Sequence, residues 1–275
     1  MDSEINENSN NICHEINYFK NHATELFHCL INREKKPGLS YLTIETRSNM
    51  MDLFVRGEGP RGNAIIVQTA AWYFDTVAAS ATIESDDVKV VAGACYLMAT
   101  KLHGSSKRAT DLVSSPEKVL RLETAERSIM KLLNFPWQPV VAQYFITYWS
   151  VVVCDPSNCK EFEAAATFIH TAALVKSKVL SLNYPSVLAA AAMCTALNML
   201  DEFEFLKRLG KNTIYQDVVR DKIQHLTLCT EHRDVLLAIT QSGKYRGLNE
   251  NMEGHPLIKK MLISLQNKRY GFYLP

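Results

Sequence analysis

The sequence lacks long hydrophobic runs, an excess of either charge, and the alternation of apolar and polar residues that marks a half-buried strand. No stretch reaches the roughly 18 apolar residues that a membrane-spanning helix requires. The 30 Lys and Arg residues almost balance the 29 Asp and Glu residues, so the formal net charge is +1. Bulk electrostatics therefore favour neither nucleic acid nor an anionic membrane as a partner. Because no window shows strand alternation, we expect an all-α protein.

Sequence signatures of an enzyme are also missing. Neither G-x-S-x-G nor H-E-x-x-H occurs, and no D-F-G follows the kinase-like triplet His232-Arg233-Asp234. Residues 57–62 spell the G-x-G-x-x-G of dinucleotide-binding proteins, but that motif follows a strand, and here the preceding segment has helical spacing. Pro60 also removes a backbone amide from a loop that would bind phosphate through its amides. We interpret the segment as a turn between two helices and expect neither enzymatic activity nor a cofactor.

The cysteines form no recognisable disulfide or metal-binding pattern. Their number is odd and several lie in apolar helical runs; they stand at positions 13, 29, 95, 154, 159, 194 and 229. This pattern is typical of buried free thiols in a reducing compartment. The closest pair, Cys154 and Cys159, has no second pair to complete a zinc site. The sequence thus predicts no metal site.

The most apolar segment, residues 88–103, has the composition of a buried helix. It is apolar on nearly every side for three turns, and such a helix is buried on every face. Its small residues, among them Ala92 and Gly93, allow neighbouring helices to approach closely, and one cation, Lys101, stands near its end. We expect the central helix of a bundle that brings a charge to the surface at its C-terminal end.

Residues 185–199 repeat this pattern, with Val187 in the place of Val90 and Asn198 in the place of Lys101. A long amphipathic helix precedes each copy, and a polar turn with further helices follows, so we expect two units of about five helices. The predicted divisions are a disordered tail (1–11), a helix with its link (12–44), the first unit (45–154), the second unit (159–245), and a C-terminal tail with a short helix (246–275).

Five segments of the chain, in order, resemble the cyclin family. They resemble the family's M-R-A-I-L-V-D-W-L, its Y-I-D-R, its central helix ending in A-S-K, its V-L-R-M-E…L-x-F, and the L-P-S-x-x-A-A-A of its second box. The segments are 47–54, 73–75, 91–101, 119–135 and 184–191. The resemblance covers most of the chain. It implies two tandem cyclin-box five-helix bundles with an extra N-terminal helix.

The resemblance also implies a binding site for a cyclin-dependent kinase. The family's kinase-binding pair is a lysine at the end of the third helix and a glutamate in the fifth, which correspond to Lys101 and Glu126. Such a pair can donate to and accept from backbone groups of a partner, and it is costly to break when buried. Without the resemblance, it would be a surface salt bridge worth under about 1 kcal/mol. The flanking apolar positions of the family correspond to Met130, Phe135 and Trp137, and those of its first helix to Ile16, Tyr18 and Phe19; without the resemblance, these six would be core residues.

Cell-cycle members of the family also carry a shallow apolar patch that docks substrates bearing an R-x-L motif. In this chain, Arg56 replaces the glutamate that pairs with the substrate arginine, and Lys89 replaces a glutamine. Two cations repel an arginine, so we expect a degenerate patch with weak or no docking. The positions assigned to the patch are Thr46, Arg47, Asn49, Met50, Leu53, Arg56 and Lys89.

The function implied by the resemblance is that of a regulatory subunit, which activates or redirects its kinase and affects the cell cycle or transcription. A cyclin does no chemistry itself, because it shifts the kinase toward its active conformation by binding that conformation more tightly. The alternative is a cyclin-fold scaffold, like the core of general transcription factor IIB, that binds nucleic acid or transcription factors without a kinase. The balanced charge argues against direct nucleic-acid binding, and no membrane partner is expected. We expect the nucleus and cytoplasm as locations, and the divergence at family positions suggests a virus-encoded member, such as a fish retroviral cyclin.

Overall fold

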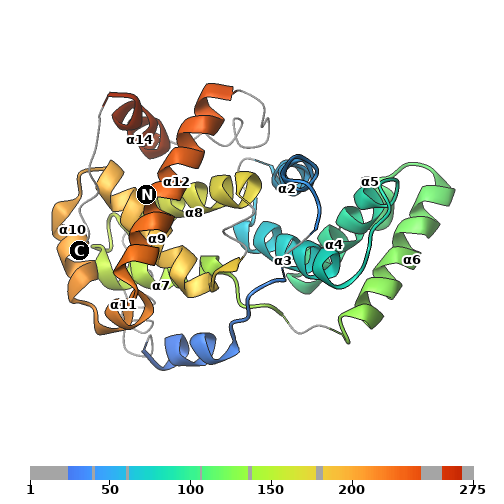
Figure 1. Ribbon diagram of the computed structural model, residues 1–275, viewed down its shortest axis with the longest axis horizontal. Coiled ribbons are helices and arrows are strands. Elements are labelled where there is room, and N and C mark those ends of the chain that lie inside the picture. Colours follow the sequence, from blue (N-terminus) through green and yellow to red (C-terminus); the bar gives the residue numbers. More distant parts are fainter. Residues whose placement is uncertain are drawn as a thin grey trace, which may run out of the picture.

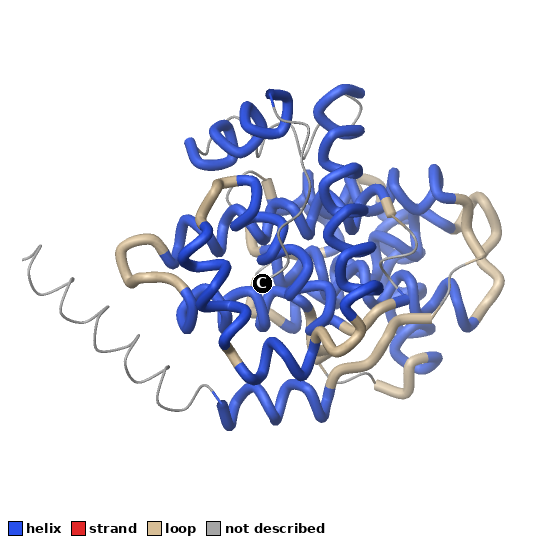
Figure 2. Tube along the Cα trace, turned by 60° about the vertical axis from the view of Figure 1, so that its left-hand side comes forward, coloured by secondary structure: helices blue, strands red, loops and turns tan. Residues whose placement is uncertain are grey.

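The computed structural model describes residues 24–38, 41–59, 62–105, 107–135, 138–177, 182–242 and 256–267, and every regular element in them is helical (Figures 1 and 2). The predicted all-α class with cyclin-box bundles is confirmed, and no described helix is long and apolar enough to cross a membrane. Residues 24–33 are helical. The other helices are α2 (Ile44–Glu58), α3 (Ala64–Ser80), α4 (Val88–Leu102), α5 (Ala109–Leu112), α6 (Pro116–Leu132), α7 (Ala142–Val153), α8 (Cys159–Lys176), α9 (Pro185–Met199), α10 (Phe203–Lys211), α11 (Thr213–Val218), α12 (Lys222–Ser242) and α14 (Pro256–Asn267).

The helix starts follow the local sequence. The side chain of Thr43 accepts a hydrogen bond from the amide of Thr46 at the start of α2, and Asn63 does the same for Ile65 at the start of α3. Such caps satisfy amides that have no partner within the helix. Residues 57 and 58 form the end of α2, Gly59 follows with a φ of 77°, and α3 begins at Ala64. The glycine-rich segment therefore follows a helix and not a strand, as interpreted from the sequence, while residues 60 and 61 lie outside the described residues.

Each half of the chain is built around one helix. In the first half α4 packs against α3 and α6, and in the second half α9 packs against α7, α8 and α12 (Figure 1). The prediction that the segment 88–103 is buried on every face is only partly right, because Lys89 is exposed and Val90 and Val91 are half-buried. Its repeat, α9, fits that description better, since its described side chains are buried except for half-buried Val187 and Asn198.

A buried ion pair joins the two halves. Arg47 on α2 donates from Nε and one terminal nitrogen to the two carboxylate oxygens of Asp75 on α3, each at 2.7 Å. Its other terminal nitrogen donates to the backbone oxygens of Leu174 (2.7 Å) and Ser177 (3.2 Å), at the end of α8. Arg47 and Asp75 are each only 1% exposed. One guanidinium therefore fastens three helices from both halves.

The helical residues 24–33 pack on the second half. The ring of Phe27 is buried and lies 4.8–5.7 Å, between centroids, from the rings of Phe145, Tyr148 and Trp149 on α7. After the helix ends, the carboxylate of Glu34 accepts from the backbone N (2.9 Å) and the hydroxyl (2.8 Å) of Ser186, in the first turn of α9. A carboxylate at a helix N-terminus is favoured by the helix dipole. The N-terminal segment thus supports the central helix of the second half.

Candidate functional site

Lys101 and Glu126 form a two-point ion pair at the end of α4. Lys101 lies in the last turn of α4, where a cation is favoured by the helix dipole, and Glu126 lies on α6, which packs along α4. Lys101 Nζ donates to both carboxylate oxygens of Glu126 at 2.7 Å. The carboxylate side chain is 11% exposed and the lysine side chain 51% exposed. The pair is therefore sheltered on the glutamate side and open to solvent on the lysine side.

This arrangement leaves hydrogen-bonding capacity for a partner. The ammonium group has three N–H donors and each carboxylate oxygen has two lone pairs, so neither group is saturated by the ion pair. The neighbouring residue Leu102 is 42% exposed, and Leu132, in the last turn of α6, is 46% exposed. The geometry is that of a charged pair beside exposed apolar side chains, which can bind a protein surface.

The other predicted kinase-contact residues fall into three groups. Phe135 is 64% exposed and has a φ of 51°, so it projects from the turn after α6 and is not a core residue. Met130 is half-buried and packs against the core. Trp137 and the three residues of the predicted first helix lie outside the described residues; the latter are Ile16, Tyr18 and Phe19.

An apolar groove on α6 was missed by the sequence reasoning. It has a cavity volume of about 880 Å³ and lies between α4, α6 and the loop before α4. Its apolar lining includes Val90, Val91, Leu120, Ile129 and Leu132. The signal in the sequence was weak, because Leu120 and Leu132 lie more than three helical turns apart on α6 with polar residues between them. The groove lies on the helix that carries Glu126.

The predicted substrate-docking patch is corrected at two positions. Arg47 is buried in the ion pair with Asp75, and Met50 is 4% exposed in the core, so neither lies on a surface. Leu53, Arg56 and Lys89 are exposed. Arg56 Nε lies 3.1 Å from Asp52 Oδ2, which offsets part of its charge. The repulsion of a substrate arginine therefore depends chiefly on Lys89.

We expect an R-x-L peptide to show no binding at low-micromolar concentration, measured by fluorescence polarisation with a labelled peptide. The reason is the positive charge of Lys89, with a smaller contribution from the partly neutralised Arg56, where a substrate arginine would lie. The control is the same peptide with alanine in place of its arginine, which removes the repulsion. A low-micromolar Kd that depends on the peptide's arginine would contradict the prediction.

Comparison with known proteins supports the family resemblance. A family model described as "Cyclin, C-terminal domain" matches residues 141–246. A viral cyclin from Herpesvirus saimiri superposes with a TM-score of 0.63 at 14% sequence identity, covering 83% of this chain and 99% of that chain. A chain of the CAK complex from Chaetomium thermophilum, solved with ATP-gamma-S, gives a TM-score of 0.53 at 16% identity, covering 94% of this chain and 86% of that chain. No curated protein matches this sequence.

These findings define the fold of the protein. The chain has the cyclin fold, and its residues 141–246 match the cyclin C-terminal domain, so the predicted resemblance to the cyclin family is confirmed. The matched range includes α7, which packs against α8 and α9. Our predicted second unit begins later, at 159. In the structure, α7 stands before α8 and α9 as α2 stands before α3 and α4.

One group of potential metal ligands lies on other helices than the Lys101–Glu126 ion pair. Among the residues that the structure describes, three side chains that can bind a metal lie close together. They are Cys194 on α9 and His225 and Cys229 on α12. Cys154 and Cys159, the pair weighed from the sequence, are buried free thiols, and burial raises the pKa of Cys154 to about 12.

Proposed function

We propose that this chain is a cyclin-type regulatory subunit that binds a cyclin-dependent kinase through the surface around Lys101 and Glu126. The observation that carries the proposal is the ion pair between two helices that the family resemblance had singled out, with its lysine open to solvent. The cyclin fold of the chain supports it. The exposed ring of Phe135 and the exposed side chain of Leu132 supply apolar surface at the end of α6.

The mechanism follows from differential binding. In this proposal the kinase supplies the lysine, glutamate and metal-binding aspartate of phosphoryl transfer, and this chain contributes binding groups. A subunit that binds the active conformation of a kinase more tightly than the inactive one raises the population of the active form. A tenfold shift requires a difference of about 1.4 kcal/mol between the two binding free energies. An effect on the cell cycle or on transcription, in the nucleus or cytoplasm, would follow from the kinase bound.

Substituting Lys101 or Glu126 by alanine is expected to weaken kinase binding by about tenfold or more. Each change removes one half of the pair and leaves the other charge to be buried alone in the interface. Affinity would be measured by biolayer interferometry against a panel of purified cyclin-dependent kinases, and the panel would also identify the partner. The matched control is Arg208→Ala, which removes a surface ion pair with Asp155.

A charge swap separates an interface role from a structural one. The double variant Lys101→Glu with Glu126→Lys keeps an ion pair between α4 and α6 but reverses the charges that a partner meets. We expect this variant to unfold only a few degrees below the wild type, because the glutamate loses the favourable interaction with the helix dipole at the end of α4, and to bind the kinase as poorly as the single variants. Wild-type affinity in both alanine variants, or in the swap, would overturn the proposed site.

A further inference from the structure

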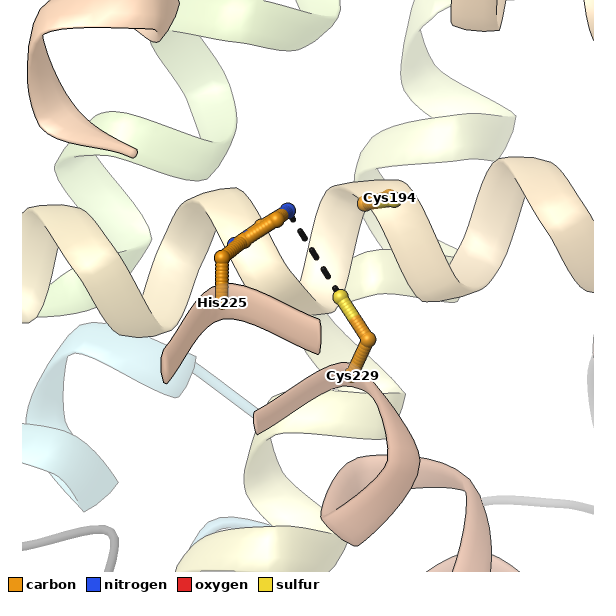
Figure 3. A group of neighbouring side chains, drawn as sticks. All are labelled: Cys194, His225 and Cys229. Carbon is orange, nitrogen blue, oxygen red and sulfur yellow. Dashed lines mark hydrogen bonds between the residues drawn. The ribbon is translucent and has the colours of Figure 1, made fainter. Parts of the chain in front are cut away.

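Three metal-ligating side chains converge in the interior of the second half. Cys194 lies on α9, and His225 and Cys229 lie on α12 with their side chains toward α9 (Figure 3). Their ligand atoms all lie within 4.8 Å of one another. All three residues are buried, at 0%, 3% and 0% exposure for Cys194, His225 and Cys229. None of them takes part in the proposed kinase-binding surface.

The separation of two of the ligand atoms matches that around a tetrahedral ion. His225 Nε2 and Cys229 Sγ are 3.6 Å apart. Around a tetrahedral Zn²⁺, with Zn–S of about 2.3 Å and Zn–N of about 2.0–2.1 Å, a sulfur and a nitrogen ligand lie about 3.6 Å apart. The two residues are four apart on one helix, so they share a face. The third ligand comes from α9, which packs against that face of α12.

The His225 ring makes its polar contacts through Nε2, the ring nitrogen that lies 3.6 Å from Cys229 Sγ. The Tyr215 hydroxyl, on α11, lies 2.8 Å from the same His225 Nε2. The other ring nitrogen, Nδ1, is buried and has no hydrogen-bond partner among the described residues. Tyr215 is 1% exposed. The Tyr215 hydroxyl thus hydrogen-bonds the nitrogen that would bind an ion, and on binding it would exchange this hydrogen bond for the fourth position as a neutral oxygen ligand.

The charges of the group suit one class of ion. Two thiolates and a neutral imidazole around a divalent cation have no net charge, so the ion can be buried without a further counter-ion. Thiolate and imidazole ligands select zinc over magnesium and calcium, which prefer oxygen. A set of donors filled by the protein is typical of a structural site rather than a catalytic one.

We propose that Cys194, His225 and Cys229 bind a structural Zn²⁺ ion that links α9 to α12, with the Tyr215 hydroxyl at the fourth position. The ion holds the long helix α12 against the central helix of the second half. It acts on the stability of that half, and it is independent of the kinase-binding proposal.

The full chain, expressed without a histidine tag in zinc-supplemented medium and purified under reducing conditions, is expected to contain about one zinc per molecule. The metal would be measured by inductively coupled plasma mass spectrometry. Replacing zinc with Co²⁺ is expected to produce thiolate-to-cobalt absorption in the near ultraviolet. Cys194→Ser and Cys229→Ser should each lose the zinc and this absorption. The matched control Cys154→Ser, a buried cysteine of the same half, should keep both.

Chelation gives an independent readout. A strong zinc chelator is expected to lower the Tm of the wild type and of Cys154→Ser, and to leave the Tm of Cys229→Ser unchanged. The proposal is overturned if the wild type holds no stoichiometric zinc and shows no cobalt–thiolate absorption. It is equally overturned if Cys229→Ser keeps the zinc, or if mass spectrometry finds a Cys194–Cys229 disulfide in the isolated protein. Should the serine variants fail to fold, the metal content and cobalt spectrum of the wild type decide.

Discussion

Replacing Arg47 with alanine is expected to lower the free energy of unfolding by about 3–5 kcal/mol, the cost of breaking a buried ion pair on one side. The carboxylate of Asp75 would remain 1% exposed with no cation beside it. The backbone oxygens of Leu174 and Ser177 would lose the donor that joins them to α2. Because folded proteins are stable by only about 5–15 kcal/mol, this single change removes a large fraction of the stability.

The measurement is denaturation in urea followed by circular dichroism, with the midpoint and the slope determined for each variant. Arg47→Lys keeps the charge but not the planar two-point contact, so we expect an intermediate loss. The double variant Arg47→Met with Asp75→Leu removes both charges, and it is expected to be more stable than Arg47→Ala. Arg208→Ala, which removes an exposed ion pair, should change little. A loss of under about 1 kcal/mol for Arg47→Ala would contradict the account of the pair as the junction between the halves.

Acidification is expected to destabilise the protein through two buried histidines. The rings of His170 on α8 and His232 on α12 stack with their centroids 6.0 Å apart, and they are 3% and 0% exposed. Burial lowers the pKa of His170 to about 3 and that of His232 to about 4. His170 Nδ1 and His232 Nε2 are buried without a hydrogen-bond partner among the described residues, so neither atom has an acceptor for an added proton.

The direction in which stability changes with pH follows from these two pKa values. A histidine whose pKa is lowered by folding binds its proton more readily in the unfolded chain, whose pKa is about 6.5. The stability from the neutral rings is therefore complete above pH 6.5 and is lost as the pH falls toward 4. Between pH 7 and pH 5 each ring is expected to remove roughly 2 kcal/mol.

The test is the free energy of unfolding as a function of pH for the wild type and for His170→Phe. Below pH 6.5, the free energy of unfolding of His170→Phe should fall less steeply with decreasing pH than that of the wild type. The difference in slope should reach up to about 1.4 kcal/mol per pH unit. His28→Asn is the control for removing a histidine from the surface, because His28 is exposed. Parallel curves for the wild type and His170→Phe would show that the buried ring does not govern the acid response.

Local patterns predicted the helices well, because a helix is specified by interactions over three or four residues. The proline and serine at 115–116, for example, marked the start of α6, and Ser115 accepts a hydrogen bond from the amide of Lys118. The assignment of Lys101 and Glu126 came from the family resemblance, and the structure places their charged groups 2.7 Å apart. Periodicity alone could not have paired them, since they lie 25 residues apart on different helices.

The predicted patch on α2 was wrong at Arg47 and Met50, and one physical reason explains both errors. Which face of a helix is buried depends on the helices that cover it, and α2 is covered by α3 and α8. The partners of Arg47 lie 28 and about 130 residues away along the chain, in Asp75 and in the end of α8. No local rule indicated that this arginine would be among the most buried side chains of the protein.

The sequence by itself determined that the chain is helical, that its central helix is repeated, that its glycine-rich segment follows a helix and not a strand, and that it resembles the cyclins. Each of these depends on neighbouring residues or on an ordered series of motifs. The tertiary structure alone decided which charges meet at the junction of the halves, that α4 borders a groove, and that Cys194 stands beside His225 and Cys229. These depend on how distant helices pack, because side chains more than a few turns apart are brought together only when the core is formed.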